Sequence, residues 1–495
     1  MQSERITSER LFKRPRLRSI DNTGGERHAS WFELFFDLVF VIAVAQVAKT
    51  LGGDLSPEGF LRYIVLFAPV WWAWIGYTFY ADRFESDETT YRLLMFTGML
   101  AVAALALNVS SAFTGDDVSA FALSYVVVRL ILIVLYARAA YYVPLAREFC
   151  VRYIVGFALG AGLWLASAFV SGPARYWLAA AGLAVELLTP FINFRIVNRT
   201  PYDTSHIPER FGLFTIIVLG EAVVAAANGA GEVGWDATAA LTASAGFAIA
   251  AALWWVHFNF VEDQGLRSES TAARNLYLYT HFFLVASIVS IGIGVEHAIV
   301  ESHEGGASLA TRAALCGGLA MFLAAITLIR LATGVCRLIY TRLAAIGVTL
   351  LLLFAGGILT PLLLVVAALA VLVGEVWVES IYDESSSAGQ NAEAQPVRCT
   401  HLDQVQQVEM RTDGCEECLA GKQKWVHLRL CLVCGHVGCC DSSPNKHATA
   451  HFRETGHPLI WSLEADENWT WCYVDERFVA TNQTMLVPTT VEQMA

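Results

Sequence analysis

Cysteines and histidines gather near the C-terminal end of the chain. All of the 11 cysteines except Cys150, Cys316 and Cys336 lie between Cys399 and Cys472. The candidate metal ligands, in chain order, are Cys399, His401, Cys415, Cys418, Cys431, Cys434, Cys439, His447, His451, His457 and Cys472. Two Cys-x2-Cys pairs followed by histidines are typical of zinc sites, because each pair can hold one tetrahedral ion from a tight turn. The clustering indicates metal ligation rather than a disulfide framework.

Acidic residues also occur inside long apolar segments. The segment "WFELFFDLVF" places Glu33 and Asp37 four residues apart, so a helix would carry both carboxylates on one face. The segment "ERFGLFTIIVLGEAVVA" begins with Glu209 and Arg210 and carries Glu221 in its interior. Acids within a membrane are costly unless they face the interior of a bundle, a cavity or a partner. These residues are therefore candidates for a functional role.

Two arginines are the expected partners of these acids. Arg129 lies in the middle of an apolar segment and is expected to pair with Asp37, and Arg312 is expected to pair with Glu221. Pairs of this kind either lock helices together or form part of a proton or ion relay. Both interpretations stay open at this point.

The composition requires most of the chain to lie in lipid. Of the 495 residues, 56% are hydrophobic and 16% are charged, which is too apolar for a soluble protein of this size. A spanning helix needs about 20 apolar residues. Twelve stretches qualify: 31–51, 58–80, 91–112, 118–141, 151–171, 174–194, 208–228, 236–258, 275–299, 307–329, 338–357 and 358–379. The last two share a very short loop, so eleven spans remain an alternative.

Arginines are concentrated in alternate loops, whereas "GGDLSPEG", "TGDD" and "NGAGEVGWD" carry no basic residue. The positive-inside rule then favours an even number of spans with both termini in the cytoplasm. No apolar stretch precedes Trp31, so the basic N-terminal segment does not resemble a cleaved signal peptide. The predicted location is the inner cell membrane, with lipid as a partner.

Several unusual features recur at an offset of about 183 residues. Arg129 returns as Arg312, and Glu186 matches Glu375 after a small insertion. The Trp-Trp pair of "VWWAWIGYTFY" returns in "LWWVHFNF", and we interpret both runs as interfacial aromatic belts and packing. The predicted fold is an all-α polytopic membrane bundle of about 12 transmembrane helices in two six-helix halves, followed by a small α+β zinc finger.

Changes in composition divide the chain into five parts. They are a basic cytoplasmic tail (1–30), the transmembrane domain (31–380), a Ser, Ala and Glu-rich flexible linker (381–396), a zinc-binding domain (397–482) and a disordered tail (483–495).

The chain resembles a known membrane family. The segments "WFELFFDLVFVIAVAQVA" and "PERFGLFTIIVLGEAVV" resemble the signature segments of the bacterial low temperature requirement A family, and the resemblance covers about residues 25–380. It implies the multispan fold and the importance of the acids and of Arg210. It does not imply a substrate.

The cysteine-rich part, about residues 398–480, resembles the ubiquitin-protease-type (UBP-type) zinc finger. The resemblance implies a first site from Cys415, Cys418, Cys439 and His447, and a second from Cys431, Cys434, His451 and His457. A third site would use Cys399, His401 and Cys472, with Asp475 where the family has a fourth cysteine. Two to three structural zinc ions are expected, since four protein ligands leave no open position for catalysis. Cys440 could replace Cys439 by proximity.

Fingers of this family bind a free C-terminal tail between aromatic residues and an arginine. Trp471 and Tyr473 match the aromatic positions, whereas Asp441 occupies the position of the arginine. An acid there repels a carboxylate, so the resemblance implies a protein or peptide partner of different chemistry. Residues 397–482 contain eight Lys and Arg against twelve Asp and Glu, so no nucleic-acid partner is expected.

Taken together, these patterns predict a transporter-like membrane protein, ion- or proton-coupled through its intramembrane carboxylates, with a cytoplasmic zinc finger that binds or senses a protein. The alternative is a membrane-anchored adaptor or receptor whose bundle only positions the finger. An enzyme ranks lowest, because the sequence shows no Ser-His pair, paired catalytic carboxylates or open metal site.

Overall fold

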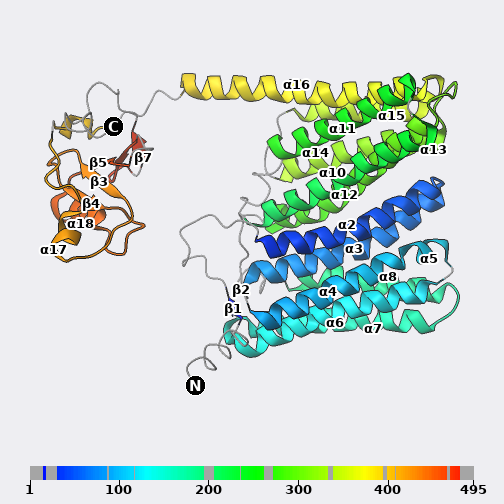
Figure 1. Ribbon diagram of the computed structural model, residues 1–495, viewed down its shortest axis with the longest axis horizontal. Coiled ribbons are helices and arrows are strands. Elements are labelled where there is room, and N and C mark those ends of the chain that lie inside the picture. The colour runs from blue at the N-terminus through cyan, green and yellow to red at the C-terminus, as the bar shows by residue number, and fades with distance from the viewer. Residues whose placement is uncertain are drawn as a thin grey trace. The chain divides into compact units, whose positions relative to one another are not determined.

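The computed structural model describes residues 15–17, 30–85, 88–115, 117–193, 206–234, 236–260, 271–332, 338–393, 399–406, 408–464, 469–475 and 477–479. The chain forms two compact units, Met1–Ile381 and Tyr382–Ala495 (Figure 1). The first unit is a bundle of long helices and the second is a small domain that contains a β-sheet.

The helices of the bundle fall into two groups along the chain. The first group contains α2 (Trp31–Gly53), α3 (Pro57–Arg83), α4 (Thr89–Leu107), α5 (Val109–Thr114), α6 (Val118–Tyr142), α7 (Arg147–Phe169) and α8 (Ala174–Ile192). The second group contains α10 (His206–Val233), α11 (Ala237–Phe260), α12 (Thr271–Val300), α13 (Leu309–Arg312), α14 (Gly318–Ala332), α15 (Ile339–Ala355) and α16 (Pro361–Glu393). A π-helical turn, Ala313–Gly317, joins α13 to α14.

Local sequence signals set the helix starts. The Ser30 side chain accepts a hydrogen bond from the Glu33 backbone, and the Glu33 side chain accepts one from the Ser30 backbone, which together form a capping box on α2. Ser56 caps α3, where Pro57 occupies the first position, and Asp117 caps α6. These caps satisfy backbone donors that a helix leaves without intrahelical partners.

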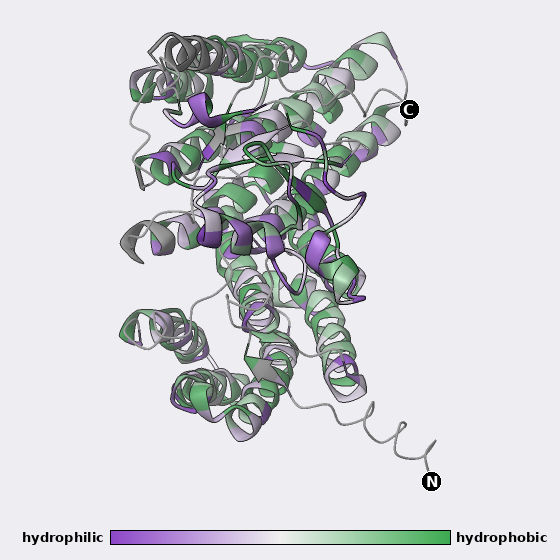
Figure 2. Cartoon of the chain, turned by 90° about the vertical axis from the view of Figure 1, so that its left-hand side faces the viewer, coloured by the Kyte–Doolittle hydropathy of each residue, from purple (hydrophilic) through white to green (hydrophobic). Residues whose placement is uncertain are grey.

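Among the described residues, eleven helices are long and apolar enough to cross a membrane, and hydrophobic residues cover most of the length of the bundle helices (Figure 2). The predicted sixth span, 174–194, is the helix α8, which is not one of the eleven. Arg175 and Glu186 lower its hydropathy. The predicted spans 338–357 and 358–379, whose separation was open, are the distinct helices α15 and α16.

The two groups pack internally in the same order. In the first group α2 contacts α4 and α4 contacts α6, and in the second α10 contacts α12 and α12 contacts α14. Figure 1 shows the first group in blue to cyan and the second in green to yellow. A duplication of one six-helix half, as predicted, requires that both groups share this order of contacts. The groups meet where α2 and α3 contact α10 and α12.

The chain segments before the first and after the last predicted span differ in detail from the expectation. Arg16–Leu17 (β1), in the basic N-terminal tail, pairs in antiparallel fashion with Phe84–Glu85 (β2) at the end of α3. After the last predicted span, α16 continues to Glu393 and so covers most of the stretch predicted as a linker, 381–396. Alanine, glutamate and glutamine in that stretch are compatible with a helix.

The second unit contains an antiparallel five-stranded sheet in the order β4-β3-β5-β6-β7. The strands are β3 (Leu428–Cys431), β4 (Val437–Cys439), β5 (Leu459–Ser462), β6 (Thr470–Cys472) and β7 (Arg477–Val479), with the helices α17 (Glu416–Ala420) and α18 (His447–Thr455). Its apolar core is small and centres on Leu430, Val437 and Leu459. A core of this size needs additional support, which bound metal commonly supplies.

Candidate metal centres and intramembrane charge cluster

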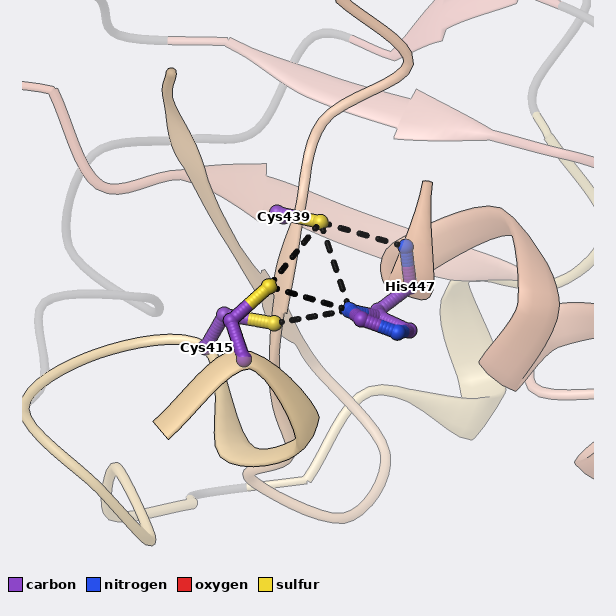
Figure 3. Close-up of side chains that lie close together, drawn as sticks. Cys415, Cys439 and His447 are labelled. Atoms are coloured by element: carbon purple, nitrogen blue, oxygen red, sulfur yellow. Dashed lines mark hydrogen bonds between the residues drawn. The ribbon is translucent and has the colours of Figure 1, made fainter. Parts of the chain in front are cut away.

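Four side chains meet between α17, β4 and α18. Cys415 precedes α17 and Cys418 lies within it, whereas Cys439 ends β4 and His447 begins α18. The three sulfurs lie 3.2–3.4 Å from His447 Nδ1, and the sulfurs of Cys418 and Cys439 are 3.9 Å apart. Figure 3 shows Cys415, Cys439 and His447 directed toward one centre.

These separations match the edges of a zinc tetrahedron. With Zn–S of about 2.3 Å and Zn–N of about 2.0 Å, sulfurs on one ion lie about 3.8 Å apart and a sulfur lies about 3.5 Å from a nitrogen. All four ligand atoms lie within 4.8 Å of one another. The residues therefore fit zinc with a closed ligand shell, which is a structural rather than a catalytic arrangement.

A second group includes Cys431 at the end of β3 and Cys434 in the turn that leads to β4. It consists of Cys431, Cys434, His451 and His457. Cys434 Sγ lies 3.3 Å from His451 Nε2, and His451 Nε2 lies 3.3 Å from His457 Nδ1. Because His447 and His451 are one helical turn apart on α18, this helix supplies a ligand to each group and connects them.

The third group includes a carboxylate. Cys399, His401, Cys472 and Asp475 have ligand atoms within 4.8 Å of one another. His401 Nδ1 lies 3.2 Å from Asp475 Oδ2, and Cys472 Sγ lies 3.6 Å from the same oxygen. Aspartate is a zinc ligand in other proteins. The geometry therefore fits the mixed ligand set that the sequence predicts, with Asp475 in place of a cysteine.

The neighbouring thiols Cys439 and Cys440 have different surroundings. Cys439 belongs to the first group, whereas Cys440 Sγ lies 3.5 Å from Ser443 Oγ and 3.8 Å from His427 Nδ1. Cys440 is in none of the three groups. The structure thus selects Cys439 over the alternative that proximity in sequence left open.

Two residues that the sequence did not single out connect the first and second groups. His436 Nε2 lies 2.8 Å from Glu417 Oε1, and the His436 ring stacks on His451 at 4.1 Å between ring centroids. Glu417 Oε2 in turn lies 3.4 Å from Cys415 Sγ. Hydrogen bonds around ligands fix their orientation. Glu417, an acid between the two cysteines of the first Cys-x2-Cys pair, was the only sequence signal for its contact with His436.

Burial changes the pKa of several ligands. It raises the pKa of the Cys415 thiol to about 12 and that of Cys431 to about 11, because a thiolate is poorly solvated there. Burial lowers the pKa of His451 to about 4, and His436 and His457 add to this effect. A neutral imidazole is the form that binds a metal.

The predicted peptide-binding residues lie on β6, which carries Trp471, and directly after it, at Tyr473. The Tyr473 ring stacks on Phe452 at 4.7 Å, and its hydroxyl lies 3.1 Å from Thr449 Oγ1. Thr449 donates to Asp441 Oδ1 at 2.6 Å, which connects this acid to the tyrosine. Trp471 is half-buried on β6.

Asp37 and Arg210 form an ion pair inside the membrane bundle. Arg210 Nη2 on α10 donates to Asp37 Oδ1 on α2 at 2.6 Å, and Trp74 Nε1 on α3 donates to the same oxygen at 2.8 Å. The Arg210 guanidinium also lies 3.5 Å from Glu33 Oε1. All of these side chains are buried. The first and seventh predicted spans are therefore connected by charge.

The cluster extends through a histidine. His206 Nε2 lies 3.7 Å from Glu33 Oε2, and His206 Nδ1 lies 2.9 Å from Asp82 Oδ1 at the end of α3. His206 and Asp82 were missed from the sequence. His206 lies four residues before Arg210, a spacing that places both on one face of a helix and could have indicated it.

Comparison with known proteins agrees with this architecture. A family model described as bacterial low temperature requirement A protein matches residues 28–376. The chain belongs to this family. A second model, described as the zinc finger in ubiquitin-hydrolases and other proteins, matches residues 415–484. The two family resemblances seen in the sequence are confirmed.

Two similar proteins give further comparison. An uncharacterized protein of Rhizobium meliloti (strain 1021) is 26% identical over 314 residues, which cover 60% of this chain and 75% of that protein. A protein of Rhodopseudomonas palustris solved by solution NMR is 47% identical over 19% of this chain and 93% of its own, with a TM-score of 0.18.

The partner predicted for Arg129 is wrong. In this low temperature requirement A protein, Arg129 on α6 pairs with Glu186 on α8 at 2.8 Å, and both side chains are fully buried. The Tyr125 hydroxyl accepts from Arg129 Nε at 2.9 Å and donates to Glu186 Oε2 at 2.6 Å. A Cβ at Gly160 of α7 would lie 2.7 Å from Glu186 Oε1, so glycine leaves room for this pair.

The partner predicted for Arg312 is also wrong. Arg312 donates to the backbone oxygens of Leu353 and Phe354, at 2.7 and 3.2 Å, at the end of α15. Glu221 is half-buried, and within the described part of the chain it has no ion pair. The sequence gives the helical face of each residue but not which neighbouring helix lies opposite.

Two predicted residues remain, Glu375 on α16 and Glu209 on α10. Glu375 is buried and lies 4.0 Å from Arg342. One turn later, Glu379 pairs with Arg342 and, at 3.2 Å, with Arg330. Glu209, next to Arg210, is half-buried. Glu186 on α8 and Glu379 on α16, the last helix of each group, thus both pair with an arginine of the same group.

Proposed function

We propose that the bundle is an ion- or proton-coupled transporter in which Glu33, Asp37 and Arg210 carry the coupling. The observation behind this is the buried Asp37–Arg210 pair, which connects α2 of the first helix group to α10 of the second. Buried ionisable residues within membrane bundles commonly mark ion and proton pathways.

The geometry of Asp37 favours reversible binding of a proton or a cation. Its Oδ1 accepts both hydrogen bonds, while Oδ2 is buried and has no hydrogen-bond partner in the described part of the chain. A proton or cation at Oδ2 would weaken the attraction between Asp37 and Arg210, because Coulomb attraction requires the carboxylate charge. Loading of one carboxylate would then alter the contact between the two helix groups.

Flux in liposomes tests this proposal. We expect the purified protein to move protons in response to an imposed sodium or potassium gradient, as reported by a pH-sensitive dye, and Asp37→Asn to reduce this movement to the level of empty liposomes. Glu148→Gln is a matched control, because the Glu148–Arg152 pair is exposed. Absence of flux in the parent would contradict the proposal and favour the adaptor.

For the second unit we infer a domain that binds or senses a protein. Support comes from the zinc-finger match and from the surface that contains Tyr473, Thr449 and Asp441. The acid favours a partner terminus with a nearby cation over a bare carboxylate. We expect partner capture by the full-length protein to be competed by free C-terminal peptides and weakened by Tyr473→Ala. Competition by internal peptides alone would contradict terminus recognition.

We also place both termini in the cytoplasm of a cell with this protein in its inner membrane. The uneven distribution of loop arginines supports this orientation. A reporter fused after Glu384 should be active only in the cytoplasm, and a periplasmic signal would reverse the assignment.

A further inference from the structure

A cavity lies inside the bundle, away from the charge cluster. It contains about 620 Å³ of empty space, including the part that opens outward. Its walls come from α3, α6, α7, α8 and α12, and α3 contacts both α6 and α12. The lining is mostly aromatic and includes Trp71, Trp72, Tyr153 and Tyr279. A mostly aromatic lining of this kind is typical of pockets that hold a small organic ligand.

The tryptophan pair in the wall is buried, so of the two roles expected for this run, interfacial belt and packing, its position fits packing. Trp71 is 2% exposed and Trp72 5%, whereas the corresponding Trp254 and Trp255 are 43% and 46% exposed. The first pair therefore faces the interior of the protein, and only the second has the exposure of a lipid-facing belt.

Both buried indoles keep an unused hydrogen-bond donor. In the described part of the chain, neither Trp71 Nε1 nor Trp72 Nε1 has a hydrogen-bond partner. An indole N–H can only donate, so a group that satisfies it must be an acceptor. A buried donor without a partner is costly, which favours a ligand that carries acceptor oxygens.

The wall also favours a flat ligand. The Trp72 and Tyr279 rings stack at 5.9 Å with 24° between their planes, and Tyr136 and Tyr153 stack at 5.6 Å with 27°. Aromatic rings bind other rings in offset-stacked or edge-to-face arrangements. A flat ring with acceptor oxygens at its edge matches both the aromatic faces and the indole donors.

Among the lining residues that the structure describes, the one charged residue is Arg83, which already has contacts. The Arg83 guanidinium lies over the Phe79 and Phe149 rings, at 5.3 and 5.0 Å from their centroids. A neutral headgroup therefore fits better than a phosphate. On the α8–α12 side Pro190 and Tyr279 are half-buried, so the wall there is not sealed. A tail could leave on this side.

From these observations we propose that the cavity binds a membrane-soluble quinone, with its ring among the aromatic side chains and its carbonyl oxygens accepting from Trp71 and Trp72. This site is independent of the proposed transport pathway, because it shares no residue with the Asp37–Arg210 cluster.

Equilibrium binding of a radiolabelled decyl-substituted benzoquinone to the full-length protein tests the proposal. We expect saturable binding, and Trp71→Phe or Trp72→Phe, which keep a ring but remove the donor, should weaken it about three- to tenfold. Trp164→Phe is the matched control, because Trp164 Nε1 is also buried with no hydrogen-bond partner among the described residues, but does not line the cavity. Leu278→Trp, which fills the cavity from a half-buried position, should abolish binding.

Three results would overturn the proposal. They are absence of saturable binding in the parent, equal weakening by Trp164→Phe, and equal competition by decylbenzene, which has no carbonyl groups. Competition by a fatty acid or an anionic phospholipid as strong as that by unlabelled quinone would assign the cavity to lipid instead and would likewise overturn it.

Discussion

At the scale of single residues, the zinc ligands were the most predictable part of the molecule. Their types and short spacings restrict the possible partners, and the structure brings each predicted set of four together, including the one with Asp475. The ion pairs were less predictable. Arg129 and Asp37 are both buried, yet each pairs with another residue, because helical periodicity does not specify the neighbouring helix.

The choice between adjacent thiols leads to a first prediction. Cys440→Ser should leave the zinc content of the purified full-length protein unchanged, since Cys440 lies outside the three groups. Cys439→Ser should lower it by one ion per chain, because the first group then keeps only three ligands. Mass-spectrometric metal analysis measures both, and a loss of zinc in Cys440→Ser would contradict the assignment.

The carboxylate ligand leads to a second prediction. Asp475→Ala should remove one zinc ion per chain, because the third group is left with two sulfurs and one nitrogen. Asp475→Cys should retain that ion, since a thiolate is also a zinc ligand. If Asp475→Ala and the parent contain equal zinc by the same metal analysis, Asp475 is not a ligand.

At the scale of elements, the fold class and most helices could be predicted from the lengths of the apolar segments. One helix, α8, is an exception. The helix α8 is present but is not one of the eleven apolar spans, since Arg175 and Glu186 lower its hydropathy. Glu186 pairs with Arg129 of α6. A hydropathy scale counts this acid as unfavourable in lipid, although the ion pair connects α8 to α6. The short strand β1 had no comparable sequence signal.

The contact between α6 and α8 leads to a third prediction. Glu186→Gln leaves the fully buried Arg129 without its counter-charge and should lower the free energy of unfolding by about 3–5 kcal/mol. Glu148→Gln breaks an exposed pair with Arg152 and should cost at most about 1 kcal/mol. Thermal unfolding in detergent compares them, and equal effects would show that the α6–α8 pair does not stabilise the bundle.

At the scale of the whole molecule, two units with separate cores belong to one chain. The bundle has a large apolar core, whereas the unit with the three ligand groups has a small one, so we expect bound metal to stabilise it. The division between them followed from composition. The continuation of α16 to Glu393 did not, because its polar sequence has no apolar period.

Removal of metal leads to a fourth prediction. A strong zinc chelator should unfold the second unit, since a structural zinc contributes about 10–16 kcal/mol of apparent binding free energy at neutral pH. The helical circular-dichroism signal of the bundle should persist, and zinc should restore the second unit. Proteolysis during chelation reports the change, and continued resistance of residues 399–479 would contradict metal-dependent folding.

The central proposal, in its proton-coupled form, is that Asp37 changes its protonation state inside the bundle. Infrared difference spectra of the purified protein after a pH step test it without knowledge of a substrate. The account predicts a carboxylic-acid band that is present in the parent and in Glu148→Gln and absent in Asp37→Asn. Identical spectra from the parent and Asp37→Asn would contradict it.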